Sequence, residues 1–497
     1  MNRLIPGSIQ VGPDRGWARS YPEDVVSKVI MKTAVRIIFR VFPAALLFSG
    51  ALLLSAAVYT ARAQTVSIDR DPQIADMVKA VSADHLRQLV QELAGFGTRH
   101  TLSDTTSDSR GIGAARRWIK AELERYARES GGRLMVEYDS YVQEGGIRRV
   151  EKATEIKNVI AILPGVDTAD KRVFIVSGHY DSRNSDVSDA VSDAPGANDD
   201  CSGTAAVMEM ARIMSKHRFK ATIIFACVAG EEQGLLGSGH LAARAKQEGW
   251  QVAGMITNDI VGNSQGSGTL LRDNTRVRVF SEGIPVAAGE KEIARIRQLG
   301  MENDSPSRQL ARYLKELGER YVDHLEIMLI YRPDRFLRGG DHLPFSREGF
   351  PAIRVTEMNE HFRYQHQDVR TENGLEYGDL VQHVDFEYLR KVTAMNMASL
   401  ANLAASPGPP EQVQIIMEGL SNETVLAWKA PQSQDPTLSY YVLIRETSSP
   451  VWQKKIRVPA TRVRLPYSKD NYFFAVQAVD AAGHESLPVF PLPAQAE

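Results

Sequence analysis

The sequence is poor in cysteine and histidine, and neither sign of charge is in clear excess. Two cysteines, Cys201 and Cys227, cannot form a disulfide framework or a zinc site built from several thiolates. Lysine and arginine number 59 against 61 aspartates and glutamates, so no basic surplus indicates a nucleic-acid partner. With 43% hydrophobic and 24% charged residues, the composition excludes a mostly disordered chain, a collagen-like repeat and a polytopic membrane protein.

The first 63 residues predict export. Residues 1–30 are polar and irregular, and we interpret them as an extension upstream of the true start at Met31. Residues 31–63 then contain a positive beginning, a mostly apolar run over 41–59 and the small-residue site Ala61-Arg62-Ala63, the layout of a secretory signal peptide. The apolar run is also long enough to stay in a bilayer. We expect a secreted or periplasmic protein, with a membrane-anchored form as the alternative.

Residues 66–405 have the pattern of one large α/β domain. Up to about residue 130, apolar residues recur at helical spacing. Beyond that point, short apolar runs alternate with helical patterns, which predicts a largely parallel twisted sheet flanked by helices. These runs lie at 158–163, 173–177, 222–228, 252–257 and 352–355. The stretch 263–338 has a weaker pattern, and we expect an added helical hairpin and loops there.

A proline-rich linker at 406–410 separates this domain from residues 411–497. The second segment has short strands and turns, typical of an all-β sandwich. Its stretches 426–428 and 472–486 resemble a fibronectin type III module. We expect the module to fold by itself, to carry no catalytic group and to attach the protein to a surface or polymeric substrate, with a role as a spacer as the alternative. Its one histidine, His484, lies in a turn-like stretch away from clustered acids.

Residue types that bind metals follow three of the apolar runs directly: His179 and Asp181, then Glu231 and Glu232, then Asp259. Because carboxyl ends of parallel strands meet at one edge of a sheet, we expect these side chains to lie close together. Asp199, before a helix, and His366, in a polar loop, complete the set. Each residue alone has an ordinary interpretation, such as a helix cap or a surface side chain. Together they predict a metal site.

The residue types also indicate which metal binds. Two imidazoles with carboxylates and no thiolates favour zinc, with manganese or cobalt as competitors. Five ligands exceed the three that one catalytic zinc takes, so we expect two ions that share a carboxylate and hold a water between them. Of the adjacent Glu231 and Glu232, one binds metal and the other moves the proton from the water to the leaving amine. Asp181 can accept the second imidazole N–H of His179.

These motifs are specific enough to suggest a family. The stretches His179-Tyr180-Asp181-Ser182 and 195–203, together with 93–100, resemble the secreted co-catalytic zinc exopeptidases of metallopeptidase family twenty-eight, the group of the bacterial leucine aminopeptidases. The resemblance covers about residues 70–405. It implies two zinc ions, one bound by His179 and Asp259, the other by Glu232 and His366, with Asp199 bridging them, Glu231 as the general base and Asp181 as the partner of His179. It also implies that the segment 340–345 shapes the substrate pocket.

Two positions depart from the family pattern. The last histidine stands in His366-Gln367-Asp368 rather than His-Thr-x-x-Asp, and His361 lies five residues earlier. The tyrosine that some members carry before the Asp-His segment is absent, which leaves Arg338 or Tyr364 as candidates to steady the oxyanion.

The resemblance predicts an exported di-zinc aminopeptidase that acts on peptides. A carboxypeptidase of the same family, a glutaminyl cyclase on the same fold and a non-catalytic receptor-like module are the alternatives. We expect Cys201 and Cys227 to be structural, with a disulfide between them as the other reading. The preferred substrate residue and the oligomeric state stay open.

Overall fold

The computed structural model describes residues 70–417, 419–431 and 437–495, so the predicted extension and signal segment lie outside the described residues. Within these ranges no helix is both long and apolar enough to cross a membrane. The helices are α1 (Pro72–Lys79), α2 (Ala83–Gly95), α3 (Gly111–Glu129), α4 (Cys201–Met214), α5 (Leu236–Gln247), α6 (Glu290–Gln298), α7 (Pro306–Tyr321), α8 (His342–Arg347), the 3-10 helix η1 (Val381–His383) and α9 (Phe386–Ala405). The strands of residues 70–405 are β1 (Met135–Gln143), β2 (Thr154–Leu163), β3 (Arg172–His179), β4 (Thr222–Val228), β5 (Gln251–Asn258), β6 (Arg276–Ser281), β7 (Glu326–Ile330), β8 (Ala352–Glu357), β9 (Arg370–Glu372) and β10 (Leu375–Tyr377).

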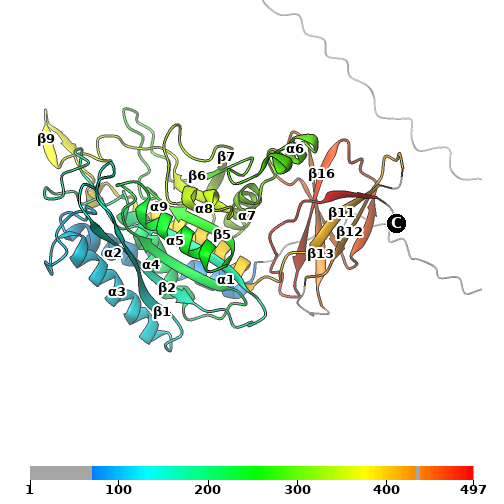
Figure 1. The fold of residues 1–497 in the computed structure, drawn as a ribbon, viewed down its shortest axis with the longest axis horizontal. Coiled ribbons are helices and arrows are strands. Elements are labelled where there is room, and N and C mark those ends of the chain that lie inside the picture. Colours follow the sequence, from blue (N-terminus) through cyan, green and yellow to red (C-terminus); the bar gives the residue numbers. More distant parts are fainter. Residues whose placement is uncertain (1–69, 418, 432–436, 496–497) are drawn as a thin grey trace, which may run out of the picture. The chain divides into compact units, whose positions relative to one another are not determined.

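An eight-stranded sheet with the order β1-β2-β4-β3-β5-β8-β6-β7 forms the centre of residues 70–405 (Figure 1). The four central strands, β4, β3, β5 and β8, run parallel to one another. Antiparallel pairs, β1 with β2, β2 with β4 and β6 with β8, extend the sheet on both sides. The predicted α/β class with a largely parallel core is confirmed.

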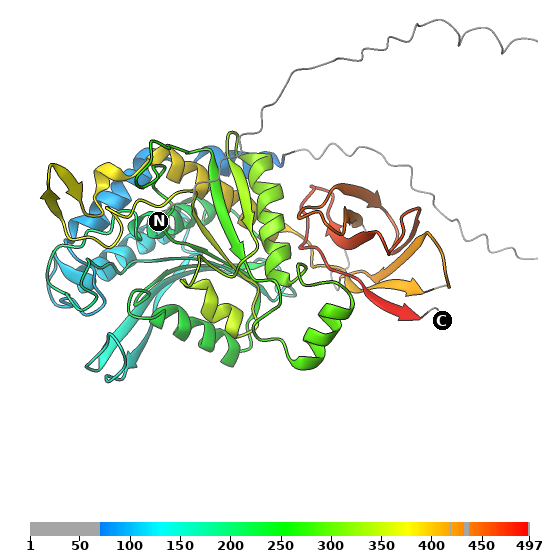
Figure 2. The same cartoon turned by 90° about the horizontal axis from the view of Figure 1, so that it is seen from above.

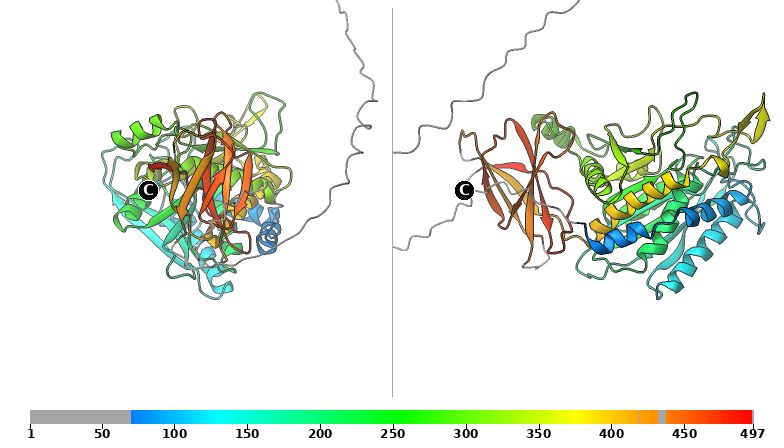
Figure 3. Two further views of the ribbon diagram at one scale, coloured as in Figure 1. Left: turned by 90° about the vertical axis from the view of Figure 1, so that its right-hand side faces the viewer. Right: turned by 180° about the vertical axis from the view of Figure 1, so that it is seen from behind.

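Helices cover both faces of the sheet, which explains why the residues of the central strands β4 and β8 are almost all buried (Figure 2). On one face, α5 and α8 bury Leu241 and Phe345 against Ile175 and Ile224. On the other face, α3 and α4 contact the strands, and α2 and α9 pack on α4. Figure 3 shows α9 beside α1, and these two helices are in contact.

The stretch 263–338 differs in part from the prediction. It contains the two expected helices, α6 and α7, but it also contains β6 and β7, which the sequence analysis missed. β6 pairs with β8, and β7 pairs with β6, so this stretch belongs to the central sheet. Both strands are short, and the charged residues Arg276, Arg278 and Glu326 interrupt their apolar pattern.

Residues 411–495 form two small sheets around one core, which confirms the predicted all-β segment. Their strands are β11 (Glu411–Met417), β12 (Thr424–Lys429), β13 (Ser439–Glu446), β14 (Lys454–Val458), β15 (Arg462–Leu465), β16 (Tyr472–Val479) and β17 (Leu492–Gln495), arranged as β15-β12-β11-β17 and β14-β13-β16. Trp428 lies in the core between them, and Tyr472 packs against it.

Ion pairs connect this segment to residues 70–405. Asp304 is fully buried and contacts Arg312 at 2.8 Å and Arg445 of β13 at 2.6 Å. The prediction for His484 is wrong, because its Nε2 lies 2.8 Å from Asp71 and its Nδ1 lies 3.1 Å from Asp480. Asp480 lies only four residues before His484, whereas Asp71 lies 413 residues away and is brought to this histidine by the fold.

Candidate metal centre

The ends of three neighbouring parallel strands supply most of the centre. His179 ends β3, Glu231 and Glu232 follow β4, and Asp259 follows β5. The strands are adjacent in the order β4-β3-β5, so their carboxyl ends meet at one edge of the sheet. Asp199 comes from the loop before α4, and His366 comes from the loop between β8 and β9.

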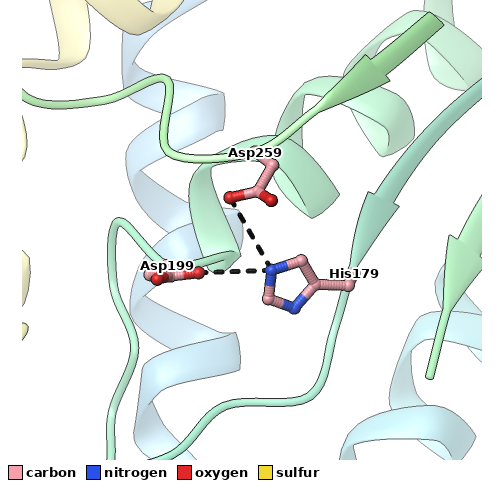
Figure 4. A group of neighbouring side chains, drawn as sticks. All are labelled: His179, Asp199 and Asp259. Atoms are coloured by element: carbon pink, nitrogen blue, oxygen red, sulfur yellow. Dashed lines mark ion pairs between the residues drawn. The ribbon is translucent and has the colours of Figure 1, made fainter. Parts of the chain in front are cut away.

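Asp199 joins two clusters of potential ligands. Its Oδ1 lies 3.2 Å from Nε2 of His179, which is also 3.9 Å from Oδ1 of Asp259 (Figure 4). Its Oδ2 lies 2.9 Å from Nε2 of His366, which is 2.8 Å from Oε1 of Glu232. Within each cluster, one ligand atom per residue lies within 4.8 Å of the others. One carboxylate therefore faces both clusters, one oxygen to each.

The adjacent acids Asp199 and Asp200 have different roles. The side chain of Asp200 caps α4, accepting the N–H of Gly203 at 2.8 Å, and it also accepts the N–H of His179 at 3.0 Å. The ordinary helix-cap interpretation thus holds for Asp200 and leaves Asp199 free to face the two histidines.

Asp181 orients the segment that follows β4. Its carboxylate accepts the main-chain N–H groups of Glu231 at 3.2 Å and Glu232 at 3.1 Å, and the hydroxyl of Thr101 at 3.0 Å. Nδ1 of His179 lies 3.1 Å from the main-chain oxygen of Asp181 and 3.5 Å from its Oδ1. Asp181 therefore holds the imidazole mainly through its carbonyl group, and its carboxylate fixes the two glutamates.

The electrostatics of the centre are dominated by buried acids. Burial raises the pKa of the Glu231 carboxyl well above its usual range, and the nearby carboxylates of Asp259 and Glu232 raise it further. Burial also raises the pKa of Asp341, in the Gly340–Phe345 segment, to about 7. Both carboxylate oxygens of Asp341 lack a hydrogen-bond partner among the described residues.

The pKa values of the two histidines are also raised, although burial of an imidazole by itself lowers its pKa. Burial alone would lower the pKa of His179, but the neighbouring carboxylates of Asp181 and Asp199 raise it well above its usual value. Burial likewise opposes protonation of His366, yet the charges of Glu232 and Asp199 raise its pKa to about 10. In the absence of metal, the surrounding carboxylates thus favour the protonated form of each imidazole.

Sequence analysis missed two arginines that contact the ligands. Arg183 donates from Nε to Oε2 of Glu232 at 2.8 Å, and its Nη2 lies 2.6 Å from Nδ1 of His366. Arg354, fully buried in β8, pairs with Asp259 at 2.9 Å. A signal existed for both, because Arg183 directly follows the His179–Ser182 motif and Arg354 interrupts an apolar run.

Two further residues position the Asp199 loop. Arg99 donates to the main-chain oxygens of Tyr180 and Gly196, which ties the end of β3 to this loop. Asp379 accepts the main-chain N–H groups of Asn198 at 2.9 Å and Asp199 at 2.7 Å. Asp379 lies 180 residues away from Asp199 in the chain. No local sequence pattern predicts the contact between them.

The residues fit zinc. Nε2 of His179 is buried and has no hydrogen-bond partner among the described residues, although it faces two carboxylates. An imidazole nitrogen and carboxylate oxygens in each cluster are the donor set that zinc takes in hydrolases. His179, Asp199 and Asp259 would hold one ion, and Asp199, Glu232 and His366 the other.

The alternative residues have other partners. His361 stacks on Tyr364, and Tyr364 stacks on His383, each with 3.7 Å between ring centroids. Both Nη atoms of Arg338 contact the carboxylate of Glu360, at 2.7 and 2.8 Å. Cys201 and Cys227 are buried free thiols, so the structure contains no disulfide between them.

The fold and the centre define a zinc hydrolase built on an α/β sheet, and comparison with known proteins names the family. Residues 158–386 match the model of peptidase family M28. A probable zinc metalloprotease of Leptosphaeria maculans is 47% identical over 424 residues, which cover 85% of this chain and 97% of that protein. A second one, from Pyricularia oryzae, is 43% identical over 419 residues, covering 83% of each chain. The chain belongs to peptidase family M28 and is a zinc metallopeptidase.

Solved structures with the same general fold are more distant. The LapA aminopeptidase of Legionella pneumophila has a TM-score of 0.49 and 19% identity, covering 69% of this chain and 78% of that chain. The glutaminyl cyclase of Macrostomum lignano has a TM-score of 0.47 and 15% identity, covering 68% and 94%.

Proposed function

We propose that this zinc peptidase is an exported di-zinc aminopeptidase, which cleaves the N-terminal residue from peptides. The observation that carries the proposal is the position of Asp199, whose two carboxylate oxygens face His179 and His366 separately. A shared carboxylate between two complete ligand clusters is what a pair of ions requires.

In this proposal, each residue of the centre has one task. Bound zinc ions supply a Lewis acid for the scissile carbonyl and lower the pKa of the attacking water. Glu231 takes the proton from that water and gives it to the leaving amine. Asp181 holds Glu231 in place through the main-chain N–H.

The charge of the centre supports recognition of a peptide's amino end. A carboxypeptidase needs a cationic side chain that is free to bind the substrate carboxylate. The arginines that reach the ligands are each paired, Arg183 with Glu232 and Arg354 with Asp259. The buried carboxylate of Asp341 has no hydrogen-bond partner among the described residues. The centre thus favours a substrate ammonium group over a substrate carboxylate.

Glu231→Gln tests the assignment of the base. The variant keeps the shape of the side chain and removes its basicity, so kcat on aminoacyl p-nitroanilides is expected to fall by about 10²- to 10⁴-fold. Zinc content, measured by plasma mass spectrometry, is expected to stay at two ions per chain. Glu292→Gln, at an exposed acid of α6, is the matched control. A Glu231→Gln enzyme that retains more than half of its kcat contradicts the assignment.

The same substrates test the class of peptidase. Free aminoacyl p-nitroanilides are expected to be cleaved and their N-acetylated forms to be resistant. Equal cleavage of both forms would rule out an aminopeptidase. Release of ammonia from N-terminal glutamine without cleavage would indicate a cyclase instead.

Export is part of the proposal and rests on residues 31–63. The first described helix begins at Pro72, so cleavage after Ala63 would remove no described element. N-terminal sequencing of the protein from the medium or periplasm is expected to begin at Gln64. A start within residues 31–40 on membrane-bound protein would support the anchor. The fibronectin type III-like module and its attachment role are likewise proposals.

A further inference from the structure

A small cavity lined by several polar residues lies beside the metal centre. It holds about 280 Å³, part of which is open to solvent. Three of its lining residues, Asn198, Ile260 and Gln365, are each the sequence neighbour of a candidate metal ligand. Nε2 of Gln365 also donates to Oδ2 of Asp199 at 3.0 Å. The cavity is therefore positioned to receive the substrate residue next to the bond that is cleaved.

The lining of this cavity is unusual for a pocket that takes an aliphatic side chain. Ile260 is the one aliphatic residue among the nine lining residues, and none of the nine is lysine or arginine. Two carboxyl groups, Glu357 and Asp379, face it together with the amides of Asn198 and Asn263. The lining thus offers several polar groups and no lysine or arginine, and burial raises the pKa of both carboxyl groups.

Glu357, at the end of β8, has one oxygen with room for a partner. Its Oε2 accepts Nδ2 of Asn198 and the main-chain N–H of Asn263, both at 2.9 Å. Its Oε1 has only a long contact of 3.4 Å with Nδ2 of Asn263. The residue is 1% exposed, so Oε1 can gain a full hydrogen bond only from a group that enters the cavity.

His361 provides a second, independent acceptor. It is 3% exposed, and its Nδ1 has no hydrogen-bond partner among the described residues. Burial lowers the pKa of His361, so the ring is neutral near pH 7 and its nitrogen can accept a hydrogen bond. Stacking on Tyr364 fixes the plane of the ring. A buried acceptor without a partner is costly unless a ligand satisfies it.

We propose that this cavity receives the side chain of the substrate's N-terminal residue and selects a cationic one, lysine or arginine, through Glu357 and His361. This inference rests on the proposed aminopeptidase function. A leucine side chain would bury Oε1 of Glu357 and Nδ1 of His361 without partners.

The test compares substrates that differ only in charge. The zinc-loaded enzyme is assayed with lysyl and norleucyl p-nitroanilides, and with arginyl and citrullyl p-nitroanilides. Because hydrogen bonds to charged groups are the stronger ones, kcat/KM is expected to be about 10- to 100-fold higher for the cationic member of each pair. Equal values within each pair overturn the inference. If neither member is cleaved, the proposed aminopeptidase function fails instead.

Two variants of the cavity then test which residues cause the preference for a cationic side chain. Glu357→Gln and, separately, His361→Phe are expected to reduce the lysyl-to-norleucyl ratio of kcat/KM, to about threefold or less for Glu357→Gln. Glu372→Gln, which removes an exposed acid of β9, serves as the matched control and is expected to keep the full ratio. If the lysyl-to-norleucyl ratio of kcat/KM stays unchanged in both cavity variants, another group binds the cation, and the inference is overturned.

A further measurement covers the case in which Glu357→Gln does not fold or load zinc. Free lysine and norleucine are then compared as competitive inhibitors of the unaltered enzyme and of His361→Phe. Lysine is expected to inhibit the unaltered enzyme at least about tenfold more tightly, and His361→Phe is expected to narrow the difference. Equal inhibition by both amino acids would mean that the cavity holds the α-ammonium group or no charge, and would overturn the inference.

Discussion

Zinc binding to the metal-free protein is expected to release protons, and this prediction follows directly from the histidines of the centre. The carboxylates around His366 raise its pKa to about 10, and those around His179 raise its pKa well above 6.5. Both imidazoles are therefore protonated at pH 7 in the metal-free protein. A metal ligand must be deprotonated, so each ion displaces one proton from its histidine.

The size of the effect can be worked out from these two groups. Asp199 and Asp259 have lowered pKa values and are already ionised, so they release nothing. The two histidines together release about two protons per chain at pH 7. Each displaced proton makes the apparent affinity of its site rise about tenfold per pH unit below the pKa of the histidine, which corresponds to about 1.4 kcal/mol. Zinc affinity should thus increase steeply from pH 6 to pH 8.

Isothermal titration calorimetry measures this release. Zinc is added to metal-free protein at pH 7 in two buffers that differ in ionisation enthalpy, and the difference in observed heat gives the number of protons. His366→Gln is expected to bind a single ion and to reduce the release to about one proton. A release of less than one proton by the unaltered protein would refute the reasoning, because the histidines would then be neutral before metal binds.

Three further predictions concern residues outside the ligand set. Arg183→Gln removes the hydrogen bond to Oε2 of Glu232, and calorimetry should show about 10- to 100-fold weaker binding of the second ion, with the first unchanged. The pKa of His484 is raised in the folded protein, so its contribution to stability is present below about pH 6.5 and is lost as the pH rises through the folded value. The difference in unfolding free energy between the unaltered protein and His484→Asn, measured by urea titration, should therefore shrink between pH 6 and pH 9. A difference that stays constant over this range would contradict the prediction. A chain ending at Ala405 should unfold at a lower temperature in calorimetry, because Asp304 loses its pair with Arg445, and an unchanged midpoint would show that the module is independent.

The parts of the fold that could be predicted from the sequence are those with a purely local signal. β4 begins and ends where its apolar run does, because a strand covered on both faces has no polar positions to interrupt the pattern. β1 was missed because its residues alternate in exposure at the side of the sheet, with only Asp139 fully buried. β6 was missed because Arg276 and Arg278 break its pattern, although the strand lies between β7 and β8.

The residues of the candidate site also differ in whether a local sequence pattern predicts their position. His179, Glu232 and Asp259 follow apolar runs, so the topology of a parallel sheet brings them together without further information. The contacts of Arg99 and Asp379 with the Asp199 loop span 97 and 180 residues and depend on loops whose paths have no periodic signal. His484 shows the limit most clearly, since its partner Asp71 lies 413 residues away. Composition around a residue describes its neighbours in sequence and not its neighbours in space.

The buried acids of the centre link metal binding, the pKa of the base and recognition of the substrate. Burial raises the pKa values of Asp200, Glu231 and Asp341, because each would otherwise place another negative charge near the ligands. Arg354 offsets part of this charge through its pair with Asp259, and Arg183 offsets another part through its pair with Glu232. Two divalent ions would stabilise the ionised carboxylates and so lower the pKa of Glu231 toward the range in which it accepts a proton from water. The same negative surroundings would then attract the ammonium group of a peptide's first residue, which places the N-terminal bond, rather than an internal one, beside the base.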